Sequence, residues 1–253
     1  MKAAEYKNQK ASILTGKRPP LIAVVLLSLT AAAVAITVTV SHVKREREMK
    51  SERELIAAEM SSEKESREAF LEKYGERAGV FTDERDGRVY LTVKIGKQTW
   101  MAENLAYLSD GGCNAYNDDK RNVAKYGYLY KWKMASKVAP DGWHLPDEKE
   151  WKELIEFTGG EYLAGHELKA AGLWDRQDSK DTGKSGFSAL PGGFRAVNPE
   201  PKGTSLHMGI ESCFWSGAES DDALGIHLSN NSPDVAIQRV QETRAYSIRC
   251  IKD

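Results

Sequence analysis

The sequence predicts a loop-rich α+β domain that follows a membrane-spanning helix and a charged helical stalk. Three observations support this prediction. Residues 21–40 form an uncharged, apolar run, and residues 41–78 are dense in glutamate, lysine and arginine. All six tryptophans and all three cysteines come after residue 99, among short apolar runs that glycine and proline interrupt. We therefore expect one folded domain over residues 79–253, with short strands and long connections.

The run 21–40 contains no charged residue, Asn, Gln, Gly or Pro. At about 1.5 Å of rise per residue, a helix of this length spans the ~30 Å hydrocarbon layer, so we predict a transmembrane helix. The alternative is a cleaved signal peptide, because Ala33-Val34-Ala35 has the small-x-small form of a cleavage site and a basic segment precedes it. The apolar run exceeds the ~7–15 residues of a secretory core, which favours an uncleaved anchor.

Lysine and arginine flank the span on both sides, so the positive-inside count does not decide its orientation. We expect the basic segment 1–20 to be a cytoplasmic tail, because a single early span before a folded domain commonly acts as a signal anchor. The domain then lies outside the cytoplasm, attached to the cell membrane by one span. A net charge of −1, from 36 basic and 37 acidic residues, argues against a nucleic-acid partner. The oligomeric state stays open.

The stalk 41–78 contains no glycine or proline between Val43 and Tyr74, and it places opposite charges four residues apart, as in Glu46 and Lys50. This pattern predicts a solvated helix. Its apolar residues hold no heptad register, which favours a stalk over a strong coiled coil. Gly75 and Gly79 mark the junction with the domain.

Two local patterns predict elements of the domain. Apolar and polar residues alternate over 89–95, and Gly96-Lys97 separates this strand from residues 98–101, as in a type II′ hairpin. Asp147 with Glu150 forms the pattern of a capping box at the start of a helix. Trp151, Leu154 and Ile155 then recur at helical spacing before Gly159-Gly160 ends the run, and Phe157 is a further candidate for the same face.

Several longer motifs occur in a characteristic order after residue 79. They are VYLTVKIGKQTWMAENL, YGYLYKW, GWHLPDEKEWKEL, GFSALPGGFR, FWSG and the terminal SIRCIKD. In these motifs the chain resembles the Fibrobacter succinogenes major paralogous domain family over residues 80–253. The resemblance implies an exported or surface-associated bacterial protein without an established activity.

A more distant resemblance concerns the segment from Leu145 to Trp151, which is similar to a helix start in the formylglycine-generating sulfatase-modifying enzymes. Those enzymes have a C-type-lectin-like fold. The resemblance therefore implies a mostly antiparallel, irregular sheet with two flanking helices and long loops. The sulfatase modifiers use a closely spaced cysteine pair, whereas Cys213 and Cys250 are far apart in this chain. Fold similarity does not transfer function.

The cysteines allow a structural disulfide if the domain lies outside the cytoplasm, and Cys213 with Cys250 is the candidate pair. With Cys113 the chain has three cysteines, so at least one is unpaired within the chain, and the sequence does not determine the pairing. The family often has a further cysteine where this chain has Ala139, so its pairing is not assumed.

No motif marks a catalytic, cofactor or metal site. His144 is the strongest candidate for a general base, but a hydrogen-bonded structural histidine is the more frequent role. His166, His207 and His227 lack the spacing of a zinc motif. The acidic pairs Asp118-Asp119 and Asp221-Asp222, and the segments 198–200 and 232–234, do not match calcium-binding patterns, so we expect solvated loops.

Aromatic side chains in loops suggest a platform for sugar rings, although most such residues belong to cores. The candidates are Tyr116, Tyr126, Tyr128, Tyr130 and Trp174. We expect a noncatalytic binding or adhesion module whose ligand is a polysaccharide, peptidoglycan or an envelope protein, with no cofactor. The alternatives are an enzyme related to the sulfatase-modifying oxidases and a purely structural envelope protein.

Overall fold

The computed structural model describes residues 21–176, 178, 180, 182–196, 203–217 and 223–253, and it describes side chains from residue 36 onward. The predicted cytoplasmic tail and the pair Asp221-Asp222 lie outside these ranges, as does the segment 198–200. The described contacts divide the chain into two units, residues 1–65 and residues 66–253.

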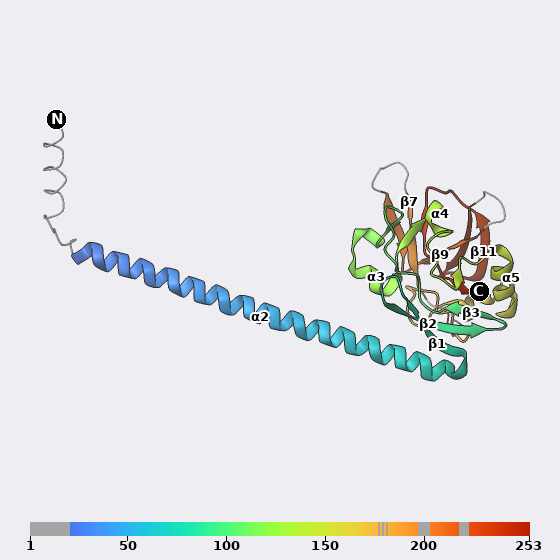
Figure 1. The fold of residues 1–253 in the computed structure, drawn as a ribbon, viewed down its shortest axis with the longest axis horizontal. Helices are drawn as coiled ribbons and strands as arrows, with labels where there is room; N and C mark the ends of the chain where they lie inside the picture. Colours follow the sequence, from blue (N-terminus) through green and yellow to red (C-terminus); the bar gives the residue numbers. More distant parts are fainter. Residues whose placement is uncertain (1–20, 177, 179, 181, 197–202, 218–222) are drawn as a thin grey trace, which may run out of the picture. The chain divides into compact units, whose positions relative to one another are not determined.

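Helix α2 runs from Leu21 to Tyr74, so the predicted span and most of the predicted stalk are helical (Figure 1). Exposed ion pairs four residues apart follow its charged part, although the partners differ from the predicted ones: Glu46 contacts His42, and Lys50 contacts Glu54. Gly75 ends the helix with a φ of +52°, a conformation that glycine adopts at little cost.

The predicted transmembrane segment is helical, but most of its side chains fall within residues 21–35, which are not described. Among the side chains that are described, no helix carries a stretch both long and apolar enough to cross a membrane. The membrane span therefore stays a prediction.

The unit 66–253 begins with the last two turns of α2 and contains two sheets and several short helices. The helical elements after α2 are η1 (Gly75–Arg77), η2 (Tyr116–Asp118), α3 (Arg121–Tyr126), α4 (Trp132–Ala135), α5 (Glu148–Phe157) and α6 (Ala164–Leu168). The strands are β1 (Ala78–Asp83), β2 (Arg88–Ile95), β3 (Gln98–Met101), β4 (Cys113–Asn114), β5 (Leu129–Lys131), β6 (Trp143–His144), β7 (Gly192–Ala196), β8 (Thr204–Met208), β9 (Glu211–Ser216), β10 (Leu224–Ser229), β11 (Ser232–Arg239), β12 (Ala245–Tyr246) and β13 (Ile251–Lys252).

The first sheet has the strand order β1-β2-β3-β13-β6, so the last strand of the chain lies beside an early hairpin. The second has the order β11-β10-β9-β7-β12-β5-β4, with β8 paired to β7. Among the described strands, every pair is antiparallel except β7 with β9. Helices α3 and α5 lie on opposite sides of the domain (Figure 1). These features confirm a loop-rich α+β domain with a mostly antiparallel sheet.

The hairpin turn and the helix cap are confirmed. The alternation over 89–95 predicts burial of one face only, and this is wrong in part, because Val89 is 42% exposed and Tyr90, on the opposite face, is fully buried. Ile95 pairs with Gln98 across a two-residue turn in which Gly96 has a φ of +60° and φ of Lys97 is not positive, as a type II′ turn requires. At the start of α5, Asp147 accepts from the Glu150 amide and Glu150 accepts from the Asp147 amide, which completes the capping box.

Phe157, a candidate for the buried face of α5, is instead 63% exposed. The side-chain ring lies against the turn at Gly96, where an added Cβ would come within 3.1 Å of it. Helical periodicity places Phe157 near the core face, but the helix ends there and the hairpin turn covers only one side of the ring.

The core has two main clusters of buried side chains. The first contains Trp100, Trp151, Phe187 and Phe214. In each contacting pair of these rings, the centroids lie at most 5.7 Å apart. The second is centred on Tyr90, Tyr130, Trp215 and Tyr246. Most of the tryptophans are therefore core residues, as large aromatic side chains are in loop-rich folds.

The last turns of α2 belong to the domain. Tyr74 is 7% exposed, and its hydroxyl donates to the Gly183 carbonyl at 2.6 Å. Arg67 reaches both carboxylate oxygens of Glu103, at 2.8 and 3.0 Å, and Phe70 packs against the first core cluster. The contacts that define the folded unit thus begin before residue 79, where the sequence places the domain boundary.

Candidate functional site

A pocket of about 200 Å³ opens on the surface where the β1–β2 turn meets the loop after β3 and the end of α4. It is smaller than the ~300–1,000 Å³ of typical small-molecule sites, so it suits one small polar group or part of a larger ligand. We call it the Arg85 pocket. Its lining consists of Arg85, Tyr107, Leu108, Ser109, Asp110, Met134, Lys137 and Val138.

Arg85 is held in one orientation on the wall of this pocket. Its guanidinium bonds both carboxylate oxygens of Asp83, at 2.6 and 2.8 Å, and donates to the Val138 carbonyl at 2.9 Å. It also covers the ring of Tyr107 at 3.9 Å from the centroid. Burial raises the pKa of the Asp83 carboxyl, but the hydrogen bonds from Arg85 outweigh it and the pKa is lowered. The pair therefore stays ionised at neutral pH.

Ser109 contributes a hydroxyl to the pocket wall. Its Oγ is buried and makes no hydrogen bond within the described part of the chain. The backbone at Ser109 is fixed by Cys113, whose Sγ accepts from the Ser109 amide at 3.4 Å. A buried hydroxyl without a partner costs about 1–3 kcal/mol, and a rotation of the Ser109 side chain toward the pocket would let a ligand supply that partner.

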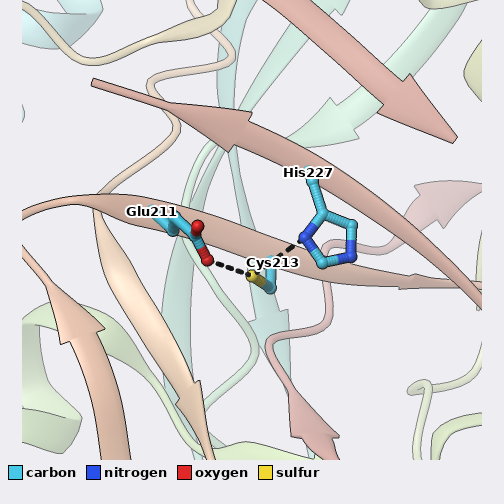
Figure 2. A group of neighbouring side chains, drawn as sticks. All are labelled: Glu211, Cys213 and His227. Atoms are coloured by element: carbon cyan, nitrogen blue, oxygen red, sulfur yellow. Dashed lines mark hydrogen bonds between the residues drawn. The ribbon is translucent and has the colours of Figure 1, made fainter. Parts of the chain in front are cut away.

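A second group of side chains lies on β9 and β10, and we call it the Cys213 cluster. Cys213 pairs directly with His227 across these strands, and Glu211 lies two residues earlier on the same face of β9. Figure 2 shows the three side chains converging: Cys213 Sγ lies 3.4 Å from His227 Nδ1 and 3.9 Å from Glu211 Oε2. All three potential ligand atoms lie within 4.8 Å of one another.

The surroundings of the Cys213 cluster favour uncharged forms of the thiol and the imidazole. Burial, followed by the charge of Glu211, raises the pKa of Cys213 well above its ordinary value. Burial lowers the pKa of His227 to about 4, with Glu211 and Arg244 acting in opposite directions. A reactive cysteine needs a depressed pKa, so this cluster is not arranged as a cysteine nucleophile.

The sequence does not reveal the Cys213 cluster, because His227 does not stand at the spacing of a metal-binding motif from any other histidine or cysteine. Only the register of β9 against β10 brings the side chains together. The available signal is Glu-x-Cys on a strand, which places both side chains on one face. A histidine on the neighbouring hairpin strand is the second part of that signal.

His144 is clamped between two carboxylates. Its Nδ1 lies 2.6 Å from Asp253 Oδ1, and its Nε2 lies 2.9 Å from Glu150 Oε1, the residue of the capping box. Burial lowers the pKa of His144, but the hydrogen bonds and charges of Asp253 and Glu150 outweigh it, and the pKa is raised. Both ring nitrogens are thus engaged in the structure, as in the hydrogen-bonded structural role.

We expect the His144 clamp to make stability depend on pH. A histidine with a raised folded pKa stabilises fully below its unfolded pKa of about 6.5, and this contribution is lost as the pH rises through the folded value. The urea midpoint of the wild type should therefore fall between pH 6 and pH 9 relative to that of His144→Gln. Identical pH profiles for the two proteins would contradict this role.

The other candidates from the sequence are engaged elsewhere. Among the aromatic residues proposed as a platform, Tyr116, Tyr130 and Trp174 are buried, and Tyr126 and Tyr128 are half-buried. Asp118 pairs with Arg195 at 3.0 Å and Asp119 with Arg121 at 2.6 Å. The segment 232–234 is the start of β11.

All three cysteines are free thiols in the structure, so it does not contain the candidate disulfide between Cys213 and Cys250. Cys213 faces Glu211 and His227, as described above. Cys250 is fully buried beside β3, where its carbonyl accepts from the Met101 amide, and burial raises its pKa to about 12. Cys113 contacts Ser109.

Together these features define an α+β domain with a small polar pocket and a separate cluster of sulfur, nitrogen and oxygen donors. The chain belongs to the Fibrobacter succinogenes major domain family, whose model matches residues 93–252. No curated protein and no solved structure matches the chain. The resemblance to the sulfatase-modifying enzymes and to the C-type-lectin-like fold therefore has no support from these comparisons.

Proposed function

We propose that this chain is a membrane-anchored, noncatalytic binding module of the bacterial cell envelope. Its domain would lie outside the cytoplasm and hold part of an envelope glycan in the Arg85 pocket. The observation that carries the proposal is the lining of that pocket, where a fixed guanidinium over a tyrosine ring lies beside a buried hydroxyl that has no partner among the described residues.

The polar groups of the pocket suit a neutral or weakly acidic sugar residue. Ser109 offers a hydroxyl, and Asp110 and Lys137 offer an acceptor and a donor at its rim. Sugar hydroxyls both donate and accept, so they can satisfy all three groups at once. A volume of about 200 Å³ fits one ring of a polymer rather than a whole substrate.

Two features support binding over catalysis. The described lining contains no histidine, the side chain that most often acts as general base, to activate the Ser109 hydroxyl as a nucleophile. The buried thiols of Cys213 and Cys250 have raised pKa values, which keeps them protonated.

The anchor rests on the apolar run 21–40 within helix α2. Ile36, Val38 and Val40, the described apolar side chains at its end, are all more than 60% exposed. Lipid would remove such surface from water, at about 25 cal/mol per Å² of apolar area. The topology is tested by adding protease to spheroplasts, whose cytoplasmic membrane is intact: cleavage of the domain supports it, and cleavage only after that membrane is lysed refutes it.

We expect the full-length chain in detergent to sediment with insoluble glucan or peptidoglycan. Ser109→Ala should weaken this binding by about fivefold, because a hydrogen bond contributes about 1 kcal/mol, and Lys137→Ala should weaken it further. Lys131→Ala, an exposed lysine outside the pocket, is the matched control. Equal binding by the wild type and the three variants would show that the pocket does not bind the glycan. If the wild type binds neither polymer, the alternative of a purely structural envelope protein is favoured.

A further inference from the structure

We propose that the Cys213 cluster is a binding site for a zinc ion, with Cys213 Sγ, His227 Nδ1 and a carboxylate oxygen of Glu211 as ligands. This site is separate from the Arg85 pocket and does not depend on the glycan-binding proposal. It places a thiolate, an imidazole and a carboxylate, the three ligand types that zinc takes from proteins, at one point on β9 and β10.

The distances fit a tetrahedral ion. Zinc binds sulfur at ~2.3 Å and nitrogen at ~2.0 Å, and a tetrahedral angle between these bonds separates the two ligand atoms by about 3.5 Å. The observed separation of Cys213 Sγ and His227 Nδ1 is 3.4 Å. Glu211 Oε2 lies 3.9 Å from the sulfur, so a small rotation of this half-buried side chain completes three corners.

The backbone at Gly225 leaves space for the His227 imidazole. Gly225 lies two residues before His227 on β10, and a Cβ at that position would come within 2.9 Å of His227 Nε2 and 2.7 Å of the Tyr246 ring. The missing side chain leaves room for the His227 ring, whose Nδ1 then points toward Cys213 (Figure 2). The Tyr246 ring packs against it edge-on at 5.3 Å.

The charge balance also favours zinc. A divalent ion with one thiolate and one carboxylate is formally neutral, which suits a site beside the positive charge of Arg244 and the buried ring of Tyr246. Binding requires the thiol to release its proton to solvent as the Zn–S bond forms, and no oxidant or reductant takes part.

His207 supports the carboxylate. Its Nδ1 lies 3.0 Å from Glu211 Oε2, and its backbone has a φ of +64°, which is uncommon for a residue other than glycine. Metal-binding carboxylates are generally held by such an outer hydrogen bond. The fourth corner of the tetrahedron is left for water.

The test is a titration of the reduced full-length chain in detergent with Co²⁺, followed by displacement with Zn²⁺. We expect one ion per chain and the near-ultraviolet absorption of a sulfur-to-cobalt bond. Cys213→Ser should abolish that absorption, and Glu211→Gln should weaken Zn²⁺ binding by at least about tenfold. Cys113→Ser and Glu242→Gln are the matched controls, because both residues lie outside the cluster, and both should bind as the wild type does.

If Cys213→Ser does not fold, Glu211→Gln still tests the proposal, because Glu211 is only half-buried and glutamine has nearly the same shape. Folding of each variant is checked by its near-ultraviolet circular dichroism. The proposal is overturned if the wild type shows no sulfur-to-cobalt absorption. It is equally overturned if folded Glu211→Gln binds Zn²⁺ as tightly as the wild type.

Discussion

Replacement of Arg249 by methionine is expected to destabilise the domain by about 3–5 kcal/mol. The change leaves several buried acceptors without a hydrogen-bond donor, and each such loss costs about 1–3 kcal/mol. Arg249 is 0% exposed. It donates to Asn104 Oδ1 from Nε and Nη2, at 3.1 and 2.6 Å, and to the Met101 carbonyl at 3.3 Å. It also donates to the Phe187 carbonyl.

Arg249 has this large effect because it links the two halves of the core. Its guanidinium lies over the Phe187 ring at 4.6 Å in the first core cluster, while its chain neighbours Ile248 and Cys250 belong to the second. Burial lowers the pKa of Arg249 to about 9, which still leaves it charged at neutral pH. Methionine fills part of the volume but donates no hydrogen bond.

The measurement is urea unfolding at pH 7 together with the melting temperature, which should fall by roughly 10 °C for a domain of this size. Arg121→Met is the control, because Arg121 is exposed and its loss should leave the midpoint unchanged. A midpoint for Arg249→Met within error of the wild type would show that the buried hydrogen bonds are not needed.

Truncation of the chain at residue 79 is expected to destabilise the domain by about 3–5 kcal/mol relative to a chain that begins at Ser66. The shorter chain lacks Tyr74 and Phe70, and burial of such side chains contributes about 1.5–3 kcal/mol each. It also leaves Glu103 without Arg67 and the Gly183 carbonyl without its donor.

Urea unfolding of the two truncated chains tests this expectation, and Tyr74→Ala in the longer chain isolates the largest contribution. Gly186 is positioned to receive Tyr74, since a Cβ there would come within 3.2 Å of the tyrosine ring. Equal stability of the two chains would place the boundary of the folding unit at residue 79, where the sequence puts it.

Elements that depend on local chemistry were predictable from the sequence. The capping box of Asp147 and Glu150 and the two-residue turn at Gly96 involve residues at most three apart, so their signals lie within one short motif. The helical state of the charged stalk follows in the same way from its composition. The end of helix α2 as a part of the domain was not predictable, because the helix continues through Ser66 without any break in pattern.

Features that depend on contacts between distant segments could not be predicted. The burial of Arg249 requires acceptors from Met101, Asn104 and Phe187, which only the assembled sheets bring together. The Cys213 cluster depends on the register of β9 and β10. The exposure of Phe157 depends on where α5 ends relative to a hairpin turn.

The contacts of Arg67 and Tyr74 have a mechanical consequence for a tethered domain. Within the described part of the chain, strand β1 lies at the edge of its sheet and pairs with β2 alone, and such a strand opens one hydrogen bond at a time when its end is pulled. Force that arrives along α2 meets the Arg67–Glu103 ion pair and the Tyr74 hydroxyl first. If the proposed anchor holds the chain at residues 21–40, tension along α2 reaches these side-chain contacts before it reaches the hydrogen bonds of β1.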